Sequence, residues 1–282
     1  TMPASSPPRS LPLSVWRADQ IEQAPIPALP SGDPGLDALL PGAGWPFAML
    51  TELLSQEAGI GELRLLVPAL HRLSRERKTI LLVAPPHLPY APALDSFEID
   101  LARLLIVQAQ HTTDRLWAIE QVLRSASFGA LLAWLPDETA RPEHVRRLQI
   151  AAQSTRGPVF LFRPSSVRQH PSPAPLRLVL SPGANESIEV DIIKRRGPAL
   201  TRPLVIRLPQ PAGTTRLRRR APAALPEAPL APAPSCPVVA IDAVALLLPG
   251  GGETALDEAG YRARIARDGT ASIAIHERGG AD

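Results

Sequence analysis

Apolar runs and amphipathic segments alternate along the chain from about residue 47 to residue 164. Short apolar runs bounded by Gly or Pro indicate buried strands, whereas apolar residues at helical spacing indicate helices that cover a sheet. The strands predicted in this part lie in "FAMLTELL", "KTILLVAPP", "DLARLLIVQA", "GALLAWLP" and "GPVFLFRP". The helices predicted between them are the segment that follows Gly61, "TTDRLWAIEQVLRS" and "RPEHVRRLQIAAQS".

Three further strands, "LRLVLSP", "SIEVDIIKRR" and "PLVIRLP", are expected to follow without a helix between them. Alternating strands and helices predict parallel crossovers, and consecutive strands predict antiparallel pairs. We therefore expect an α/β fold whose mostly parallel sheet is flanked by helices and extended by antiparallel strands. Ahead of the first strand, "LPSGDPGLDALLPGAGWP" predicts a loop–helix–loop unit that Ser31 or Asp33 caps, with Pro34 at the first helical position.

Composition divides the 282 residues into four parts, because the 34 prolines are unevenly placed. Residues 1–28 are expected to be irregular, and residues 29–208 to form the core domain. Residues 209–237 are rich in Pro, Ala and Arg, which is typical of a linker. Residues 238–282 form a tail in which alternation around Asp268-Gly269 predicts a β-hairpin, unless its first half continues a helix from Leu256.

Charge and cysteine content limit the function classes. The net charge is +3, and the basic linker and the acidic tail cancel each other, so a global attraction to nucleic acid is weak. A local DNA contact and a solvated linker both remain open for "RLRRR", which contains Arg216, Arg218, Arg219 and Arg220. The single Cys236, the lack of a signal-peptide pattern and the lack of a long apolar run favour a reduced, cytoplasmic chain without membrane contact.

The segment "TELLSQEAGIGELRLL" has the strand–loop–helix order in which phosphate-binding loops occur. Such a loop needs two glycines, a Lys for the phosphates and a Ser or Thr for Mg²⁺. Here Ser55 stands where the first Gly is needed, Gly59 and Gly61 follow, and Glu62 stands where the Lys is needed. A carboxylate facing a polyphosphate is repulsive, so we expect this degenerate loop to bind no nucleotide cofactor.

No other catalytic or metal-binding pattern is present in the sequence. The strand "GALLAWLPDE" ends in apolar residues, and its first acids, Asp137 and Glu138, come after a proline. The six His residues show no ligand spacing, and no nucleophile has a base at a recognisable spacing. The four Trp residues are interpreted as packing residues. The sequence therefore predicts a non-enzymatic protein with no catalytic residues, metal or cofactor.

Several segments together resemble ImuA, the RecA-like accessory protein of bacterial mutagenic translesion synthesis. They are "LPSGDPGLDALLPGAGWPFAMLTELL", "GIGELRLLVPAL", "GALLAWLPDE", "RRLQIAAQSTRGPVFLFRP" and "VDIIKRRGPAL". The resemblance implies a RecA-like core and a role in the SOS response to DNA damage. It implies contacts with ImuB, a polymerase homologue, and with RecA, and an indirect contact with an error-prone DNA polymerase.

The comparison with RecA also assigns candidate contact residues. "SIEVDIIKRRG" stands where RecA has a strand that ends in basic residues, so Lys194, Arg195 and Arg196 are candidates for contact with a partner, or else form a solvated turn. The loop at residues 165–175 is short and proline-rich, which argues against DNA binding by the RecA route. Two alternatives remain: a SulA-type inhibitor of cell division that binds the tubulin-like division protein, and a RecA-like ATPase with an unconventional loop.

Overall fold

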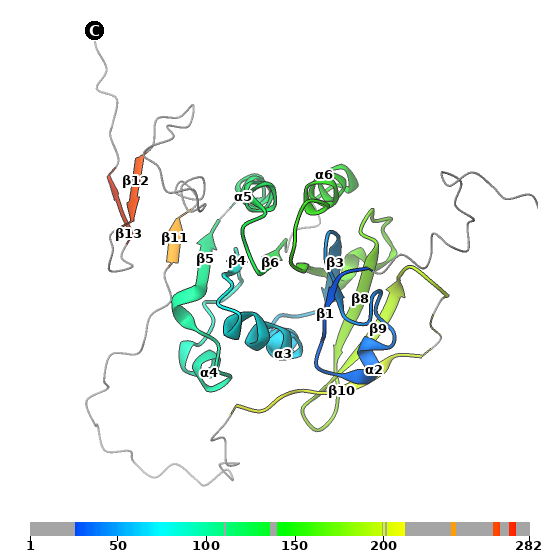
Figure 1. Cartoon of the computed structure of the whole chain (residues 1–282). Coiled ribbons are helices and arrows are strands. Elements are labelled where there is room, and N and C mark those ends of the chain that lie inside the picture. The colour runs from blue at the N-terminus through cyan, green and yellow to red at the C-terminus, as the bar shows by residue number, and fades with distance from the viewer. Residues whose placement is uncertain are drawn as a thin grey trace, which may run out of the picture.

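The computed structural model describes residues 26–109, 111–135, 140–198, 200 and 202–211, together with three short strands at 238–240, 262–265 and 271–274. Its central sheet contains β3 (Leu50–Ser55), β4 (Ile80–Val83), β5 (Leu104–Gln108), β6 (Ala130–Trp134), β7 (Val159–Pro164), β8 (Leu176–Pro182), β9 (Ser187–Lys194), β10 (Leu204–Arg207) and β11 (Val238–Ala240). The strand order is β10-β9-β8-β3-β7-β6-β4-β5-β11 (Figure 1).

The sheet is mostly parallel, as the sequence predicts. The strands from β8 to β11 in this order pair in parallel, whereas β8 pairs with β9, and β9 with β10, in antiparallel fashion. The predicted α/β class and the antiparallel extension are therefore confirmed. The strand order does not by itself distinguish a RecA-like core from other open α/β sheets, so that finer assignment stays a prediction.

Helices and short 3-10 turns lie between successive strands in the chain. They are α2 (Pro34–Asp37), α3 (Glu62–Arg75), α4 (Ala91–Ser96), α5 (Thr112–Ser125) and α6 (Pro142–Ala152), with 3-10 turns η1 (Leu101–Arg103) and η2 (Ser165–Gln169). The cap predicted for α2 is present, because the Asp33 carboxylate accepts a 2.8 Å hydrogen bond from the backbone N–H of Leu36. Among the described residues, no helix is both long and apolar enough to cross a membrane.

Helices lie on both faces of the sheet (Figure 1), and each face has its own apolar layer. On one face, α3 packs through residues such as Leu66 and Leu70 against Ile80 and Leu82 of β4. On the other face, α5 and α6 pack against the alternate residues of the same strands, including Leu81. Residues on both faces are buried because successive side chains of a strand point to opposite faces and each face has its own helices.

Smaller elements flank the central sheet. The strands β1 (Ala28–Leu29) and β2 (Trp45–Pro46) form an antiparallel pair before β3. The strands β12 (Arg262–Ile265) and β13 (Ala271–Ala274) form a second antiparallel pair, and Asp268 and Gly269, between them in the sequence, lie outside the described residues. The strand β11 extends the central sheet by pairing with β5, so a short part of the region after residue 209 joins the sheet.

Candidate protein-interaction site

The loop between β3 and α3 forms hydrogen bonds with the side chain of Glu62, the first residue of α3. Both carboxylate oxygens of Glu62 accept hydrogen bonds from the backbone N–H of Gly59, at 2.9 and 3.1 Å, and one also accepts from Gly61, at 3.1 Å. Only 6% of Glu62 is exposed. A carboxylate at the first turn of a helix is stabilised by these donors and by the helix dipole.

The Glu62 carboxylate therefore occupies the donors that a phosphate group would need at this helix start. The sequence analysis expected Glu62 to face a bound polyphosphate and repel it. The structure shows a different arrangement, in which the Glu62 carboxylate itself accepts hydrogen bonds from the loop in the place of an anion. Ser55 is the last residue of β3, where this loop begins. The two acids that follow the later strand, Asp137 and Glu138, lie outside the described residues.

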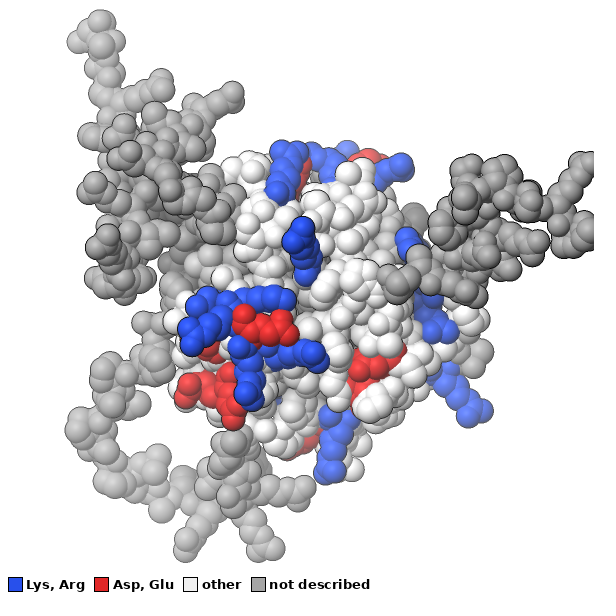
Figure 2. Space-filling model, in the orientation of Figure 1, with Lys and Arg blue, Asp and Glu red and all other residues white. Residues whose placement is uncertain are grey.

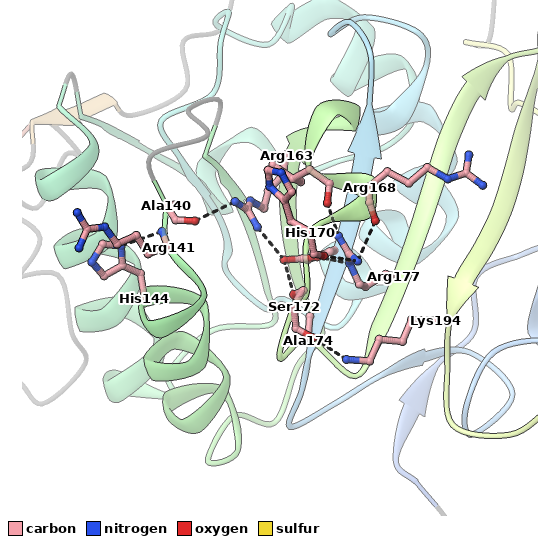
Figure 3. Close-up of polar contacts among 12 residues, drawn as sticks. Ala140, Arg141, His144, Arg163, Arg168, His170, Ser172, Ala174, Arg177 and Lys194 are labelled. Atoms are coloured by element: carbon pink, nitrogen blue, oxygen red, sulfur yellow. Dashed lines mark hydrogen bonds and ion pairs between the residues drawn. The ribbon is translucent and has the colours of Figure 1, made fainter.

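A buried charge cluster lies beside the loop, at the centre of the sheet (Figure 3). Glu52 of β3 is fully buried and accepts hydrogen bonds from Arg177 Nε at 2.6 Å, Ser172 Oγ at 2.9 Å and Arg163 Nη1 at 3.3 Å. Arg177 lies directly opposite Glu52 in the parallel pairing of β3 with β8. The cluster thus connects three adjacent strands, β7, β3 and β8.

The same guanidinium groups fix the segment between β7 and β8. Arg177 donates to the backbone carbonyls of Val167, Arg168 and His170, and Arg163 donates to that of Ala140 (Figure 3). The segment compared with a DNA-binding loop of RecA therefore contains η2, and its carbonyls are turned toward a buried arginine. The sequence analysis missed this cluster, although single charged residues inside the runs "TELL", "FLFRP" and "LRLVL" were its visible signal.

The predicted basic contact residues do not form one free patch. Lys194 Nζ donates to the carbonyl of Ser172 at 2.6 Å, and its pKa is lowered, first by burial and then by the nearby Arg177 guanidinium. Arg195 donates to the carbonyls of Leu39 and Pro198 at 2.6 and 2.9 Å.

Of the three basic residues at the end of β9, Lys194 and Arg196 are exposed and Arg195 is half-buried. The linker candidates Arg216, Arg218, Arg219 and Arg220 lie outside the described residues. On the face shown in Figure 2, Lys and Arg side chains stand beside Asp and Glu, and wide areas between them carry no charge. This mixed surface is more typical of protein recognition than of a nucleic-acid interface.

A groove lies between α5 and α6, on the side of the sheet that these two helices cover. It has a volume of about 460 Å³, and it is lined by Thr112, Thr113, Leu116, Trp117, Glu120, Arg141, His144, Arg147 and Leu148. Trp117 is 39% exposed, whereas Trp45 and Trp134 are buried, so its interpretation as a packing residue fits less well than theirs. Glu120 forms ion pairs with Arg124 of its own helix and with Arg147 of α6, which hold the two helices together.

Together these features define a class: an α/β protein whose phosphate loop is closed and whose described surface offers sites for binding other molecules. Comparisons with known proteins agree with that class. Residues 48–157 match the family model described as "Cell division inhibitor SulA". A protein of that name from Edwardsiella piscicida is 29% identical over 100 residues, which cover 36% of this chain and 58% of the relative.

A second protein of the same name, from Photorhabdus laumondii, is 28% identical over 114 residues, which cover 40% of this chain and 63% of the relative. The chain thus spans about three fifths of the length of these relatives. The matched part begins just before β3 and ends in the turn before β7. It includes the closed loop, α3, α5 and α6.

These findings correct the main hypothesis of the sequence analysis. The chain is similar to SulA, so its interpretation as an ImuA protein of translesion synthesis is wrong. The partners inferred from that resemblance were ImuB, RecA and an error-prone polymerase, and this inference is wrong as well. The relatives are named as inhibitors, and this agrees with the prediction that the chain is a binding protein and not an enzyme.

Proposed function

We propose that this chain is a SulA-type inhibitor of cell division, which acts by binding the tubulin-like division protein. The observation that carries this proposal is the match of residues 48–157 to the SulA family model. We also propose that DNA damage induces this protein and that it lies in the cytoplasm, as the sequence analysis expected. The mechanism is occupation of a surface of the partner, with no chemical step.

The groove between α5 and α6 is the surface that we assign to this contact. It lies within the matched segment, and it presents an exposed Trp117 next to Leu116. Tryptophan is enriched among the residues that dominate binding energies, because it buries a large apolar area with little loss of side-chain entropy. Arg141 and Arg147 at the groove border supply charges that can orient an acidic segment of the partner.

A polymerisation assay tests the function directly. Purified chain is added to the tubulin-like division protein and its nucleotide, and polymer is measured by light scattering and sedimentation. We expect the amount of polymer to fall in proportion to the added chain. A chain in several-fold molar excess that leaves the polymer unchanged contradicts the proposed function.

A pair of variants tests the assigned surface. Trp117→Ala should weaken inhibition roughly 30-fold, which corresponds to about 2 kcal/mol for the loss of an interface anchor. Val205→Ala is the matched control, because Val205 is 62% exposed on β10, outside the matched segment. Equal inhibition by both variants would show that the partner binds elsewhere, for example at Arg196, even if the function itself holds.

The ATPase alternative has no structural support in the described residues. Glu62 accepts hydrogen bonds from two backbone N–H groups of the loop, those of Gly59 and Gly61, and the loop contains no Lys. A nucleotide would have to displace a buried carboxylate from three hydrogen bonds before its phosphates could bind.

A further inference from the structure

A second hollow lies on the sheet itself, where β3, β4, β6 and β7 end. It has a volume of about 260 Å³, and Ser55, Ala84, Arg115, Trp134, Phe162 and Arg163 contribute to its lining. In open α/β sheets, ligands bind in the crevice outside the carboxyl ends of the strands. The cavity is separate from the groove between α5 and α6, which is lined by different residues.

The cavity lining carries two acids, Glu57 and Glu62, and two arginines, Arg115 and Arg163. The buried charge cluster beside it, to which Arg163 also belongs, is not balanced. The side chains of Arg163 and Arg177 are both 6% exposed, and they share the single carboxylate of Glu52. Two buried guanidinium groups against one buried carboxylate leave an excess of one positive charge within the cluster. A buried charge without a counter-charge is costly, so this cluster favours an additional anion.

Arg163 also has an unused donor. Its Nη1 and Nη2 bind Glu52 and the carbonyl of Ala140, but its buried Nε has no hydrogen-bond partner among the described residues. Buried polar groups without partners are rare in folded proteins, and each one calls for an explanation. Arg163 contributes to the lining of the cavity, so an anion placed there lies close to the charge of its guanidinium group.

The rest of the lining limits what the ligand can be. Glu62 borders the cavity but is engaged by Gly59 and Gly61, so the phosphate nest of the loop is already filled. A polyphosphate is therefore a poor fit. Trp134 and Phe162 stack on each other with ring centroids 4.5 Å apart and provide an apolar wall.

We propose that this cavity binds a small molecule that carries one oxyanion group, with Arg163 and Arg115 facing that group and an apolar body lying against Trp134 and Phe162. Arg115 approaches from α5, and its Nε donates to the carbonyl of Ala109 at 2.9 Å, which fixes the side chain at the border of the cavity. The site is independent of the proposed division-inhibitor function and needs no catalysis.

The test is a titration of the full chain by calorimetry, with benzoate, inorganic phosphate and neutral benzamide as probes at constant ionic strength. Benzoate should bind with a dissociation constant of about 10 mM or lower, the affinity that a ligand of this size reaches even at low efficiency per atom. Benzamide should bind at least about tenfold more weakly, because it lacks the charge. Saturable phosphate binding that is weaker than benzoate binding would show that the oxyanion is recognised and that the apolar body adds affinity.

Variants of single arginines test whether the ligand binds in this cavity. Arg115→Gln should weaken benzoate binding about tenfold, whereas Arg124→Gln, on the exposed side of the same helix, should leave it unchanged. Arg163→Gln should abolish binding, and if that variant does not fold, Arg115→Gln still decides the matter. Absence of saturable binding, equal affinity for benzoate and benzamide, or equal affinity of the Arg115→Gln and Arg124→Gln variants would overturn the proposal.

Discussion

The single carboxylate of Glu52 is the residue on which the interior of the sheet depends most. It accepts hydrogen bonds from two arginines and a serine at full burial. Replacing it by Ala leaves two guanidinium groups buried without a counter-charge. We expect Glu52→Ala to lower the free energy of unfolding by about 3–5 kcal/mol, measured by urea denaturation.

The control for this prediction is an ion pair of the same chemistry at the surface. Glu186 is half exposed and pairs with Arg64 at 3.3 Å. Because water screens such a pair, Glu186→Ala should cost less than about 1 kcal/mol. If the two substitutions cost the same, the buried cluster contributes no more than a surface contact, and our account of it is wrong.

Local and distant residues differ in how well the sequence predicts them. The position of Glu62 where a phosphate loop has its Lys could be read from the sequence, because the loop is contiguous and the required residue types are known. The cluster of Glu52, Arg163 and Arg177 could not be predicted. Arg163 and Arg177 lie 111 and 125 positions after Glu52 in the sequence, and the three residues meet only because of the strand order. No local pattern tells a buried arginine in a strand from an exposed one.

At the scale of elements, the start of α3 depends on a backbone conformation that glycine adopts most readily. Gly61 caps this helix with φ = 104°, and a Cβ atom there would lie 2.4 Å from Leu208 Cδ1. Gly59 has φ = 86°, but a Cβ atom there would meet nothing within 4 Å. The two positions therefore separate backbone strain from steric overlap.

We expect Gly59→Ala to destabilise the protein by about 1–2 kcal/mol, the cost of a left-handed conformation in a residue with a Cβ atom. Gly61→Ala should cost about 1–3 kcal/mol more, because Leu208 is part of the core and must move. Urea denaturation of both variants measures the difference. If both variants lose the same free energy of unfolding, Leu208 can move at no cost, and its packing against the start of α3 is loose.

Hydrophobic periodicity predicted the main helices and strands of the core, and the structure confirms them. It did not predict α4 or η2, which are short and begin next to prolines. Their formation depends on packing, since residues such as Ala91 and Leu94 of α4 lie against the apolar layer of α3. Short segments of this kind gain little from intrinsic propensity, so tertiary contacts decide their structure.

For the whole molecule, the sequence predicted the α/β class and the mostly parallel sheet correctly and the partners incorrectly. The segments that resembled ImuA are mostly strands, turns and buried helix faces, which determine a fold and are shared by proteins of different function. Trp117 is exposed, and nothing in a single sequence separates such a residue from a packing residue. The correction of the partner came instead from the match of residues 48–157 to the SulA family model.

The boundary near residue 209 leads to the last prediction. All of the apolar core clusters among the described side chains lie between Leu29 and Leu208. Beyond this limit, β11 is the strand that joins the central sheet, and it covers the edge of β5. A chain that ends at Pro211 should therefore still fold and unfold cooperatively, with a midpoint within a few degrees of the full chain, but the freed edge of β5 should promote self-association.

Circular dichroism and analytical ultracentrifugation of the shortened chain measure both effects. The control is the full chain with Val238→Pro and Val239→Pro. Successive backbone N–H groups of a strand point to opposite sides, so one of the two prolines must remove a donor that faces β5. This variant should self-associate like the shortened chain, because it exposes the same strand edge. If the chain that ends at Pro211 shows no cooperative transition, residues after 211 belong to the core, and the boundary inferred from composition is wrong.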